Sequence, residues 1–168
     1  MTVIIRKAII SDAEQMANIH ARSWEAAYAN IIPQNAIAET NARRSDLWNR
    51  ILSKEGGSFK FAICNGEKVI GLLTFGESRD EDADTNTLEI YSIYLLPEYF
   101  GKGFGKSAMD FVNLFAKNNG YIKITLWVLE ENCRARRFYE KCGYAVDGTE
   151  KELFVGKPLK EIRYTAIL

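Results

Sequence analysis

The apolar residues at the start of the chain change from a period of two to a period between three and four, and each period predicts one element. Residues 2–7 alternate weakly, as a half-buried strand does. Ser11 and Glu14 have the Ser-x-x-Glu spacing of a reciprocal helix cap. We therefore expect a helix from Asp12 to about Ala29, followed by a second helical region from Pro33 to Leu52.

The rest of the chain predicts several strands interrupted by two helices. Two β-prone runs, 59–64 and 68–75, are joined by Asn65-Gly66, a dipeptide that suits a tight hairpin turn. After a polar and mostly acidic loop, the expected elements are strand 88–96, helix 104–119, strand 121–129, helix 132–142, and strands 144–155 and 161–168. This order predicts a mixed α/β fold, and 168 residues suit one domain over positions 1–168.

Composition and charge narrow the class of protein. The chain has 22 Lys and Arg against 22 Asp and Glu, so its charge gives no reason to expect a broad nucleic-acid surface. Cys64, Cys133 and Cys142 form neither a disulfide framework nor a zinc-site pattern, and the lone His20 has no second ligand at metal-binding spacing. We find no secretory signal and no apolar run that could span a bilayer, so we expect a cytoplasmic protein without a metal.

The candidate chemistry lies in three alternating glycines, Gly101, Gly103 and Gly105, between a predicted strand and a predicted helix. Glycines at this spacing let the backbone direct several N–H groups toward one point at the start of the helix. The positive end of a helix favours an anion at that point. The turn is therefore expected to bind a phosphate.

Two nucleotide-binding patterns match this turn only in part. Residues 103–108 fit the G-x-G-x-x-A dinucleotide pattern, with Glu130 as a candidate ribose ligand. A dinucleotide fold normally opens with this unit, however, and here most of the chain precedes it. Residues 101–107 approach the P-loop pattern but are one residue short between the outer glycines.

Two sequence blocks resemble those of the GNAT superfamily of N-acetyltransferases. Residues 97–109, PEYFGKGFGKSAM, are similar to the family's acetyl-CoA pyrophosphate loop, [QR]-x-x-G-x-[GA], with Gly103 and Gly105 at the two small positions. Residues 132–144 are similar to its second block, N-x-x-A-x-x-x-Y-x-x-x-G-[FY], at the expected distance downstream. The resemblance implies a GNAT-type central mixed, mostly antiparallel twisted sheet flanked by helices, with a splayed cofactor cleft beside the fourth strand.

The resemblance also implies acetyl-CoA as co-substrate and assigns most of its contacts to the backbone. The pantetheine arm is expected to pair with the fourth strand, and the pyrophosphate to bind the glycine turn. The expected cofactor-binding residues are Ile93, Tyr94, Leu95, Gly101, Lys102, Gly103, Phe104, Gly105, Lys106 and Asn132. Asn132 would equally cap its helix. Phe100 stands where the family usually has Gln or Arg, which weakens a pyrophosphate contact or leaves it to Lys102 and Lys106.

Two residues have implied catalytic roles. Tyr139 matches a tyrosine that protonates the departing thiolate, and the alternative is a buried core tyrosine. Glu89 matches the position of a general base, and the alternative is a solvated strand glutamate. A base is needed because an alkylammonium, with a pKa of about 10.4, must lose a proton before it attacks. The predicted reaction is direct transfer of the acetyl group to a primary amine of an unidentified small molecule or peptide.

Two other functions stay open at this point. A nucleotide-binding oxidoreductase would bind NAD, and a non-catalytic GNAT-fold module would bind acetyl-CoA without turnover. The acidic loop at 77–84 either attracts a cationic amine or is simply solvated. We expect no nucleic-acid or membrane partner, and the resemblance implies that the chain can pair as a homodimer.

Overall fold

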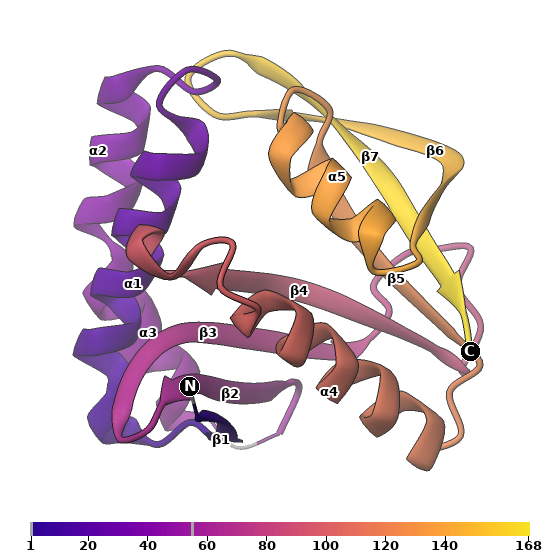
Figure 1. Ribbon diagram of the computed structural model, residues 1–168. Coiled ribbons are helices and arrows are strands. Elements are labelled where there is room, and N and C mark those ends of the chain that lie inside the picture. The colour runs from indigo at the N-terminus through magenta and orange to yellow at the C-terminus, as the bar shows by residue number, and fades with distance from the viewer. Residues whose placement is uncertain (1, 55) are drawn as a thin grey trace.

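Residues 2–54 and 56–168 are described by a computed structural model, and they form one seven-stranded sheet with helices on both faces (Figure 1). The strand order is β1-β2-β3-β4-β5-β7-β6. Strands β4 and β5 are parallel, and every other neighbouring pair is antiparallel. This arrangement confirms the expected mixed α/β fold with a mostly antiparallel sheet.

The elements follow the predicted order closely. The strands are β1 (Val3–Lys7), β2 (Phe59–Asn65), β3 (Lys68–Glu77), β4 (Thr87–Leu95), β5 (Lys123–Leu129), β6 (Ala145–Phe154) and β7 (Pro158–Ile167). The α-helices are α1 (Ala13–Tyr28), α2 (Gln34–Ala42), α3 (Arg44–Ser53), α4 (Phe104–Asn118) and α5 (Cys133–Lys141), with short 3₁₀ turns at Ile10–Asp12 and Pro97–Tyr99. No helix within the described ranges is long and apolar enough to cross a membrane.

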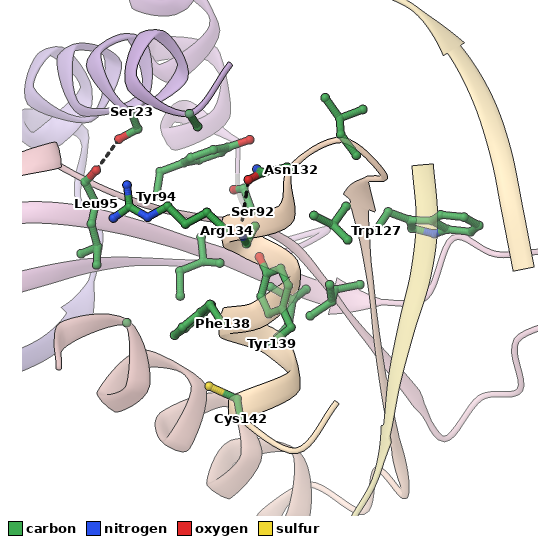
Figure 2. Close-up of a pocket in the computed structure, with 18 of the residues that line it drawn as sticks. Ser23, Ser92, Tyr94, Leu95, Trp127, Asn132, Arg134, Phe138, Tyr139 and Cys142 are labelled. Carbon is green, nitrogen blue, oxygen red and sulfur yellow. Dashed lines mark hydrogen bonds between the residues drawn. The ribbon is translucent and has the colours of Figure 1, made fainter. Parts of the chain in front are cut away.

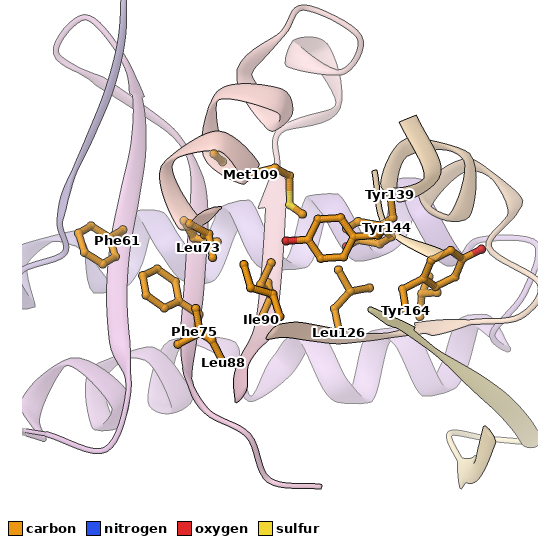
Figure 3. Packing of buried hydrophobic residues seen from close by; sticks show 14 of the residues in the cluster. Phe61, Leu73, Phe75, Leu88, Ile90, Met109, Leu126, Tyr139, Tyr144 and Tyr164 are labelled. Carbon is orange, nitrogen blue, oxygen red and sulfur yellow. The ribbon is translucent and has the colours of Figure 1, made fainter. Parts of the chain in front are cut away.

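The helices bury their apolar faces on opposite sides of the sheet. On one side, α4 and α5 pack residues such as Met109 and Tyr139 against the strands, and Figure 3 shows this cluster. On the other side, α1 and α3 pack Met16 and Trp48 against Leu72 of β3. Each fully buried apolar side chain of this size stabilises the fold by about 1.5–3 kcal/mol. The central strands are therefore held firmly from both faces.

Strands β4 and β5 separate soon after they meet. Their pairing covers only Thr87–Ile90 against Lys123–Leu126, after which β5 follows β7 while β4 stays on β3. A bulge at Tyr91 interrupts the β3–β4 register, and a bulge bends its strand. The second half of β4 therefore has a free edge that faces a gap in the sheet.

Two local predictions differ from the structure. The predicted Ser11–Glu14 cap is wrong, because the N-cap residue of α1 is Asp12 and no side chain caps the helix there. The Asp12 carboxylate instead accepts the Ile9 N–H at 2.9 Å. Asp12 also pairs with Arg6 of β1 at 2.7 Å. The second helical region is two helices, α2 and α3, divided at Arg43.

Candidate active site

A cavity of about 830 Å³ lies where β4 and β5 separate (Figure 2). Its wall consists of α1, β4, the turn before α4, β5, α5 and the β6–β7 hairpin. Side chains alternate along β5, so Leu126 and Val128 face α4 and α5, whereas Trp127 and Leu129 face the other side. The cavity therefore reaches both faces of the sheet, and we call its two ends the α5 side and the α1 side.

Ten of the twelve predicted site residues line this cavity. They are Glu89, Ile93, Tyr94, Leu95, Gly101, Gly103, Gly105, Lys106, Asn132 and Tyr139. The side chains of Phe104 and Lys102 are not part of the wall. Phe104 is buried against Tyr99, and the Lys102 ammonium lies 5.7 Å from the same ring. These two residues can offer the cavity their backbone N–H groups.

The turn before α4 presents a row of free amides. No N–H group from Gly101 to Lys106 donates to a backbone acceptor in the described part of the chain. The first N–H to do so is that of Ser107, which donates to Gly103 O at 3.0 Å. Gly101 and Gly103 have φ angles of +72° and +86°, which L residues rarely adopt. The turn thus directs amide hydrogens outward at the positive end of α4, the geometry of an anion site.

The free edge of β4 also has backbone groups without a partner strand. The Leu96 N–H donates to a β3 carbonyl at 2.9 Å. Because antiparallel strands alternate, the backbone groups of Tyr94 point toward β3 as well, and those of Ile93 and Leu95 point into the gap. Ser23 of α1 lies 2.6 Å from the Leu95 carbonyl and donates to it. An extended ligand can therefore add to β4 as an extra strand.

Helix α5 closes the α5 side and orients three predicted groups. The Asn132 Oδ1 accepts the Ala135 N–H at 3.2 Å, which confirms the predicted helix cap. Phe138 packs so closely on Gly105 that a β-carbon there would lie 3.1 Å from its ring. The Tyr139 hydroxyl points into the cavity without a hydrogen-bond partner among the described residues (Figure 2). Burial raises the pKa of Tyr139 above its usual value of about 10, so the phenol is protonated at neutral pH.

Cationic side chains dominate the α5 side. Lys106, Arg134, Arg137 and Lys141 line the cavity there, and no carboxylate of the described helices α4 and α5 does. The Arg134 guanidinium lies 3.8 Å from the centre of the Phe100 ring, a cation–π contact. This contact places a positive charge beside the position where Gln or Arg was expected from the resemblance. The α5 side is therefore suited to a polyanion.

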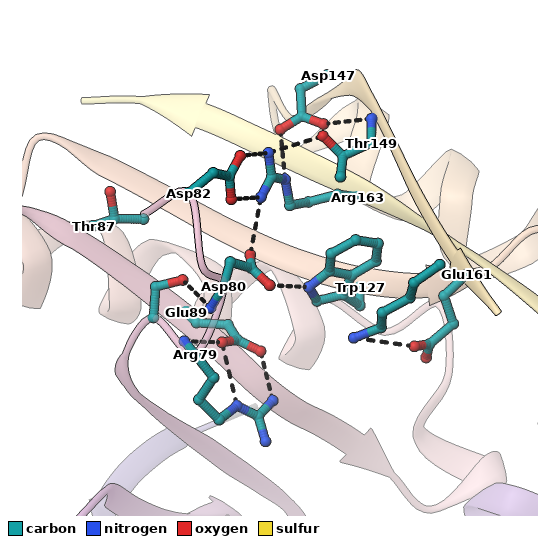
Figure 4. Close-up of polar contacts among 12 residues, drawn as sticks. Arg79, Asp80, Asp82, Thr87, Glu89, Trp127, Asp147, Thr149, Glu161 and Arg163 are labelled. Atoms are coloured by element: carbon teal, nitrogen blue, oxygen red, sulfur yellow. Dashed lines mark hydrogen bonds and ion pairs between the residues drawn. The ribbon is translucent and has the colours of Figure 1, made fainter. Parts of the chain in front are cut away.

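Glu89 faces the α1 side and is only 1% exposed, so the alternative of a solvated strand glutamate is wrong. Its carboxylate accepts three hydrogen bonds from Arg79: from the backbone N–H at 2.8 Å, from Nε at 3.2 Å and from Nη2 at 2.5 Å (Figure 4). The Arg79 side chain is 63% exposed and lies over the Tyr91 ring at 4.0 Å. The solvent-exposed side chain of Arg79 thus covers the buried carboxylate of Glu89.

A second group of ion pairs on the α1 side was not predicted from the sequence. Arg163 of β7 is buried and contacts Asp80 at 3.2 Å, Asp82 at 2.6 Å and Asp147 at 2.7 Å (Figure 4). Asp80 also accepts the indole N–H of Trp127 at 2.9 Å. The acidic loop is therefore bound to β7 rather than simply solvated, and it fixes the orientation of Trp127.

No metal site is evident within residues 2–54 and 56–168, where no three His, Cys, Asp or Glu side chains come together as ligands. The His20 Nδ1 accepts the indole N–H of Trp48 at 3.2 Å. Burial, together with the nearby Arg44 cation, lowers the pKa of His20 to about 3. His20 is therefore a neutral part of the packing between α1 and α3.

Known proteins are similar to this chain in sequence and in fold. The profile of the acetyltransferase (GNAT) family matches residues 13–144. The uncharacterized N-acetyltransferase YuaI of Bacillus subtilis (strain 168) is 31% identical over 133 residues, which cover 77% of this chain and 73% of that protein. The spermidine N(1)-acetyltransferase of Thermoplasma acidophilum is 26% identical over 163 residues, or 92% of this chain and 96% of that protein. The crystal structure of the PaiA N-acetyltransferase from Thermoplasma acidophilum in complex with coenzyme A superposes with a TM-score of 0.81 at 23% identity, over 100% of both chains.

Proposed function

The chain belongs to the acetyltransferase (GNAT) family and is an N-acetyltransferase, and we propose that it transfers the acetyl group of acetyl-CoA to a primary amine across the gap between β4 and β5. The observation that supports this proposal most is the combination of a free strand edge, a row of free amides and a cationic wall in one cavity. We further propose that positions 1–168 act as one domain, since strands from both ends of the chain belong to the same sheet.

The residues on the α5 side fit coenzyme A. The amides of residues 101–106 would donate to its pyrophosphate, and Arg134 would neutralise part of the charge. The backbone groups of Ile93 and Leu95 would pair with the pantetheine amides. The Asn132 side chain still has its amide N–H groups available to the cavity after its oxygen caps α5. The likeness to a protein crystallised with coenzyme A supports this use.

Acetyl-CoA would supply the activated acyl group as a thioester. As the amine nitrogen bonds to the acetyl carbon and the carbon–sulfur bond breaks, the nitrogen loses a proton and the sulfur gains one. Tyr139 is proposed to give the sulfur its proton, because its hydroxyl is protonated and has no hydrogen-bond partner within residues 2–54 and 56–168. Such an acid contributes roughly 10²–10⁴-fold to a rate. Direct transfer needs no covalent enzyme intermediate.

Glu89 is proposed to accept the proton that the ammonium must lose, directly or through water. It lies on the α1 side, opposite Tyr139 across the gap. Its oxygens are taken up by Arg79, so this role requires the arginine to move aside. The exposure of Arg79 allows that movement, and an incoming ammonium would replace the charge that leaves.

Release of thiol from acetyl-CoA in the presence of an amine panel tests the proposal. The panel should include spermidine, because one similar protein is named a spermidine N(1)-acetyltransferase. We expect amine-dependent release, binding of coenzyme A by calorimetry, and no binding of NAD. Binding of coenzyme A without turnover on any amine would indicate a non-catalytic module, and binding of NAD alone would indicate an oxidoreductase.

We also propose that the protein acts in the cytoplasm and pairs as a homodimer. The three free cysteines support a reducing compartment. The exposed edge strand β6, where Phe154 is largely uncovered, supports pairing through the sheet. Cell fractionation and sedimentation velocity test the two statements separately.

A further inference from the structure

We propose that the α1 side of the cavity contains an ammonium-binding subsite, formed by Trp127 and Glu161, that selects acceptors with a second positively charged nitrogen. This inference rests on the proposed function, because it concerns the acceptor of the same reaction. Figure 4 shows Trp127 and Glu161 beside the ion pairs of the acidic loop. The subsite can be identified because a cation of the chain itself, the Lys151 ammonium, occupies it.

The Lys151 ammonium occupies a place with two attractive groups. Its Nζ lies 4.0 Å from the centre of a Trp127 ring and 3.4 Å from a Glu161 carboxylate oxygen. An ammonium over a tryptophan face is attracted by the negative face of the ring, and a carboxylate beside it neutralises the charge. All three residues line the cavity. The position is therefore a site for an alkylammonium, at present filled by a lysine side chain.

The two host groups are fixed more firmly than the lysine. The indole N–H of Trp127 donates to Asp80, which is itself paired with the buried Arg163. Glu161 is half-buried on β7, between two neighbouring strands. Lys151 is exposed on the edge strand β6, and a lysine stem is flexible. An acceptor can thus displace Lys151 without disturbing the groups that bind it.

The subsite lies close to the place of acetyl transfer. Pairing of β4 with β5 ends at Ile90 and Leu126, and Trp127 is the next residue of β5. Glu89 pairs with Thr125 of β5, and both face the same side of the sheet as Trp127. Thr125 and Trp127 are two residues apart, which is roughly 7 Å along the strand. An acceptor whose first nitrogen approaches Glu89 can therefore place a second one over Trp127 through a short carbon chain.

The charge around the subsite favours a cation over an anion. Among the described residues Glu161 forms an ion pair with Lys151 alone, so removal of the lysine from the subsite leaves a negative charge for the acceptor to neutralise. Behind Trp127, the single positive charge of Arg163 faces the three carboxylates of Asp80, Asp82 and Asp147. An acceptor with a carboxylate in this place would be repelled, whereas a diamine would be attracted.

The experiment measures binding, so that it does not depend on catalysis. Protein loaded with coenzyme A is titrated calorimetrically with 1,4-diaminobutane and with 1-aminobutane. Lys151→Met, which has no ammonium in the subsite, is expected to bind the diamine about tenfold more tightly than the monoamine, the effect of one cation–π contact supported by a carboxylate. The wild type should show a smaller preference for the diamine, because the diamine must first displace the Lys151 ammonium. Glu161→Gln should reduce the preference for the diamine in both proteins, because only the cation–π contact with Trp127 remains.

The same hairpin offers a matched control. Lys160 and Glu150 form a cross-strand ion pair at 3.0 Å between β7 and β6, and neither residue lines the cavity. Lys160→Met and Glu150→Gln should leave the affinities for both amines unchanged. Equal affinity of Lys151→Met for the two amines, or a preference that Glu161→Gln leaves undiminished, would overturn the inference. A diamine preference without acetylation of either amine would support the subsite and contradict the proposed function.

Discussion

Replacement of Arg163 by methionine should strongly destabilise the fold. Arg163 is 4% exposed and pairs with three carboxylates. In the variant, the side chains of Asp80 and Asp147, 12% and 17% exposed, lose the cation that neutralises them, whereas Asp82, 60% exposed, stays hydrated. Removal of one partner of a buried ion pair costs about 3–5 kcal/mol, and an exposed pair contributes about 0–1 kcal/mol. We therefore expect the free energy of unfolding to fall by about 3–5 kcal/mol, set mainly by Asp80 and Asp147.

Urea denaturation followed by tryptophan fluorescence measures this change. The fluorescence also reports on the environment of Trp127, because Arg163 holds Asp80 in place and the Asp80 carboxylate accepts the Trp127 indole N–H. A variant that combines Arg163→Met with Asp80→Asn and Asp147→Asn should recover part of the loss, since it leaves no buried charge unpaired. A loss below about 1 kcal/mol for Arg163→Met would refute the assignment of a buried, stabilising cluster.

Three further predictions concern the cofactor, the reaction and pH. Tyr139→Phe should lower kcat by about 100-fold or more with little change in affinity for coenzyme A, and an unchanged kcat in steady-state assays would exclude the acid role. Arg134→Ala should weaken the binding of coenzyme A and of dephospho-coenzyme A equally, as measured by calorimetry, and adding Phe100→Arg to this variant should restore the affinity. A loss of affinity for coenzyme A alone would assign Arg134 to the 3′-phosphate instead. Hydrogen bonds from Arg163 lower the pKa of Asp82 to about 2. The stability that this lowered pKa contributes is present above pH about 4, the pKa of aspartate in the unfolded chain, and is lost as pH falls toward 2. The urea midpoint should therefore fall more steeply across this range in the wild type than in Arg163→Met.

Most of the fold could be predicted because its signals are local. The helical period at 104–119 corresponds to α4 at Phe104–Asn118, and Asn65-Gly66 forms the hairpin turn because Gly66 adopts a φ of +59°. The free amides of the glycine turn follow from the same local chemistry, since glycine allows the required angles. The cap at Ser11 failed because Arg6, on a neighbouring element, binds Asp12 and fixes a different start for α1.

The α1 side of the site could not be predicted in the same way. Arg163 meets Asp80 and Asp82 across 83 and 81 positions of sequence, and such a pair leaves no periodic pattern. Trp127 lies in a predicted strand, but the sequence alone does not say which face of the sheet has a cavity. The sequence therefore indicates only the negative charge of the acidic loop, whereas the folded structure shows that Asp80 and Asp82 of this loop bind Arg163 of β7.

Amide hydrogen exchange resolved to single residues, with and without coenzyme A, tests the central claim most directly. The free protein should exchange rapidly at residues 101–106 and at Ile93 and Leu95, whose N–H groups have no strand or helix partner among the described residues. Coenzyme A should slow exchange at these positions and leave the distant α3 unaffected. Binding of coenzyme A that leaves exchange at the turn and at the β4 edge unchanged would contradict the account.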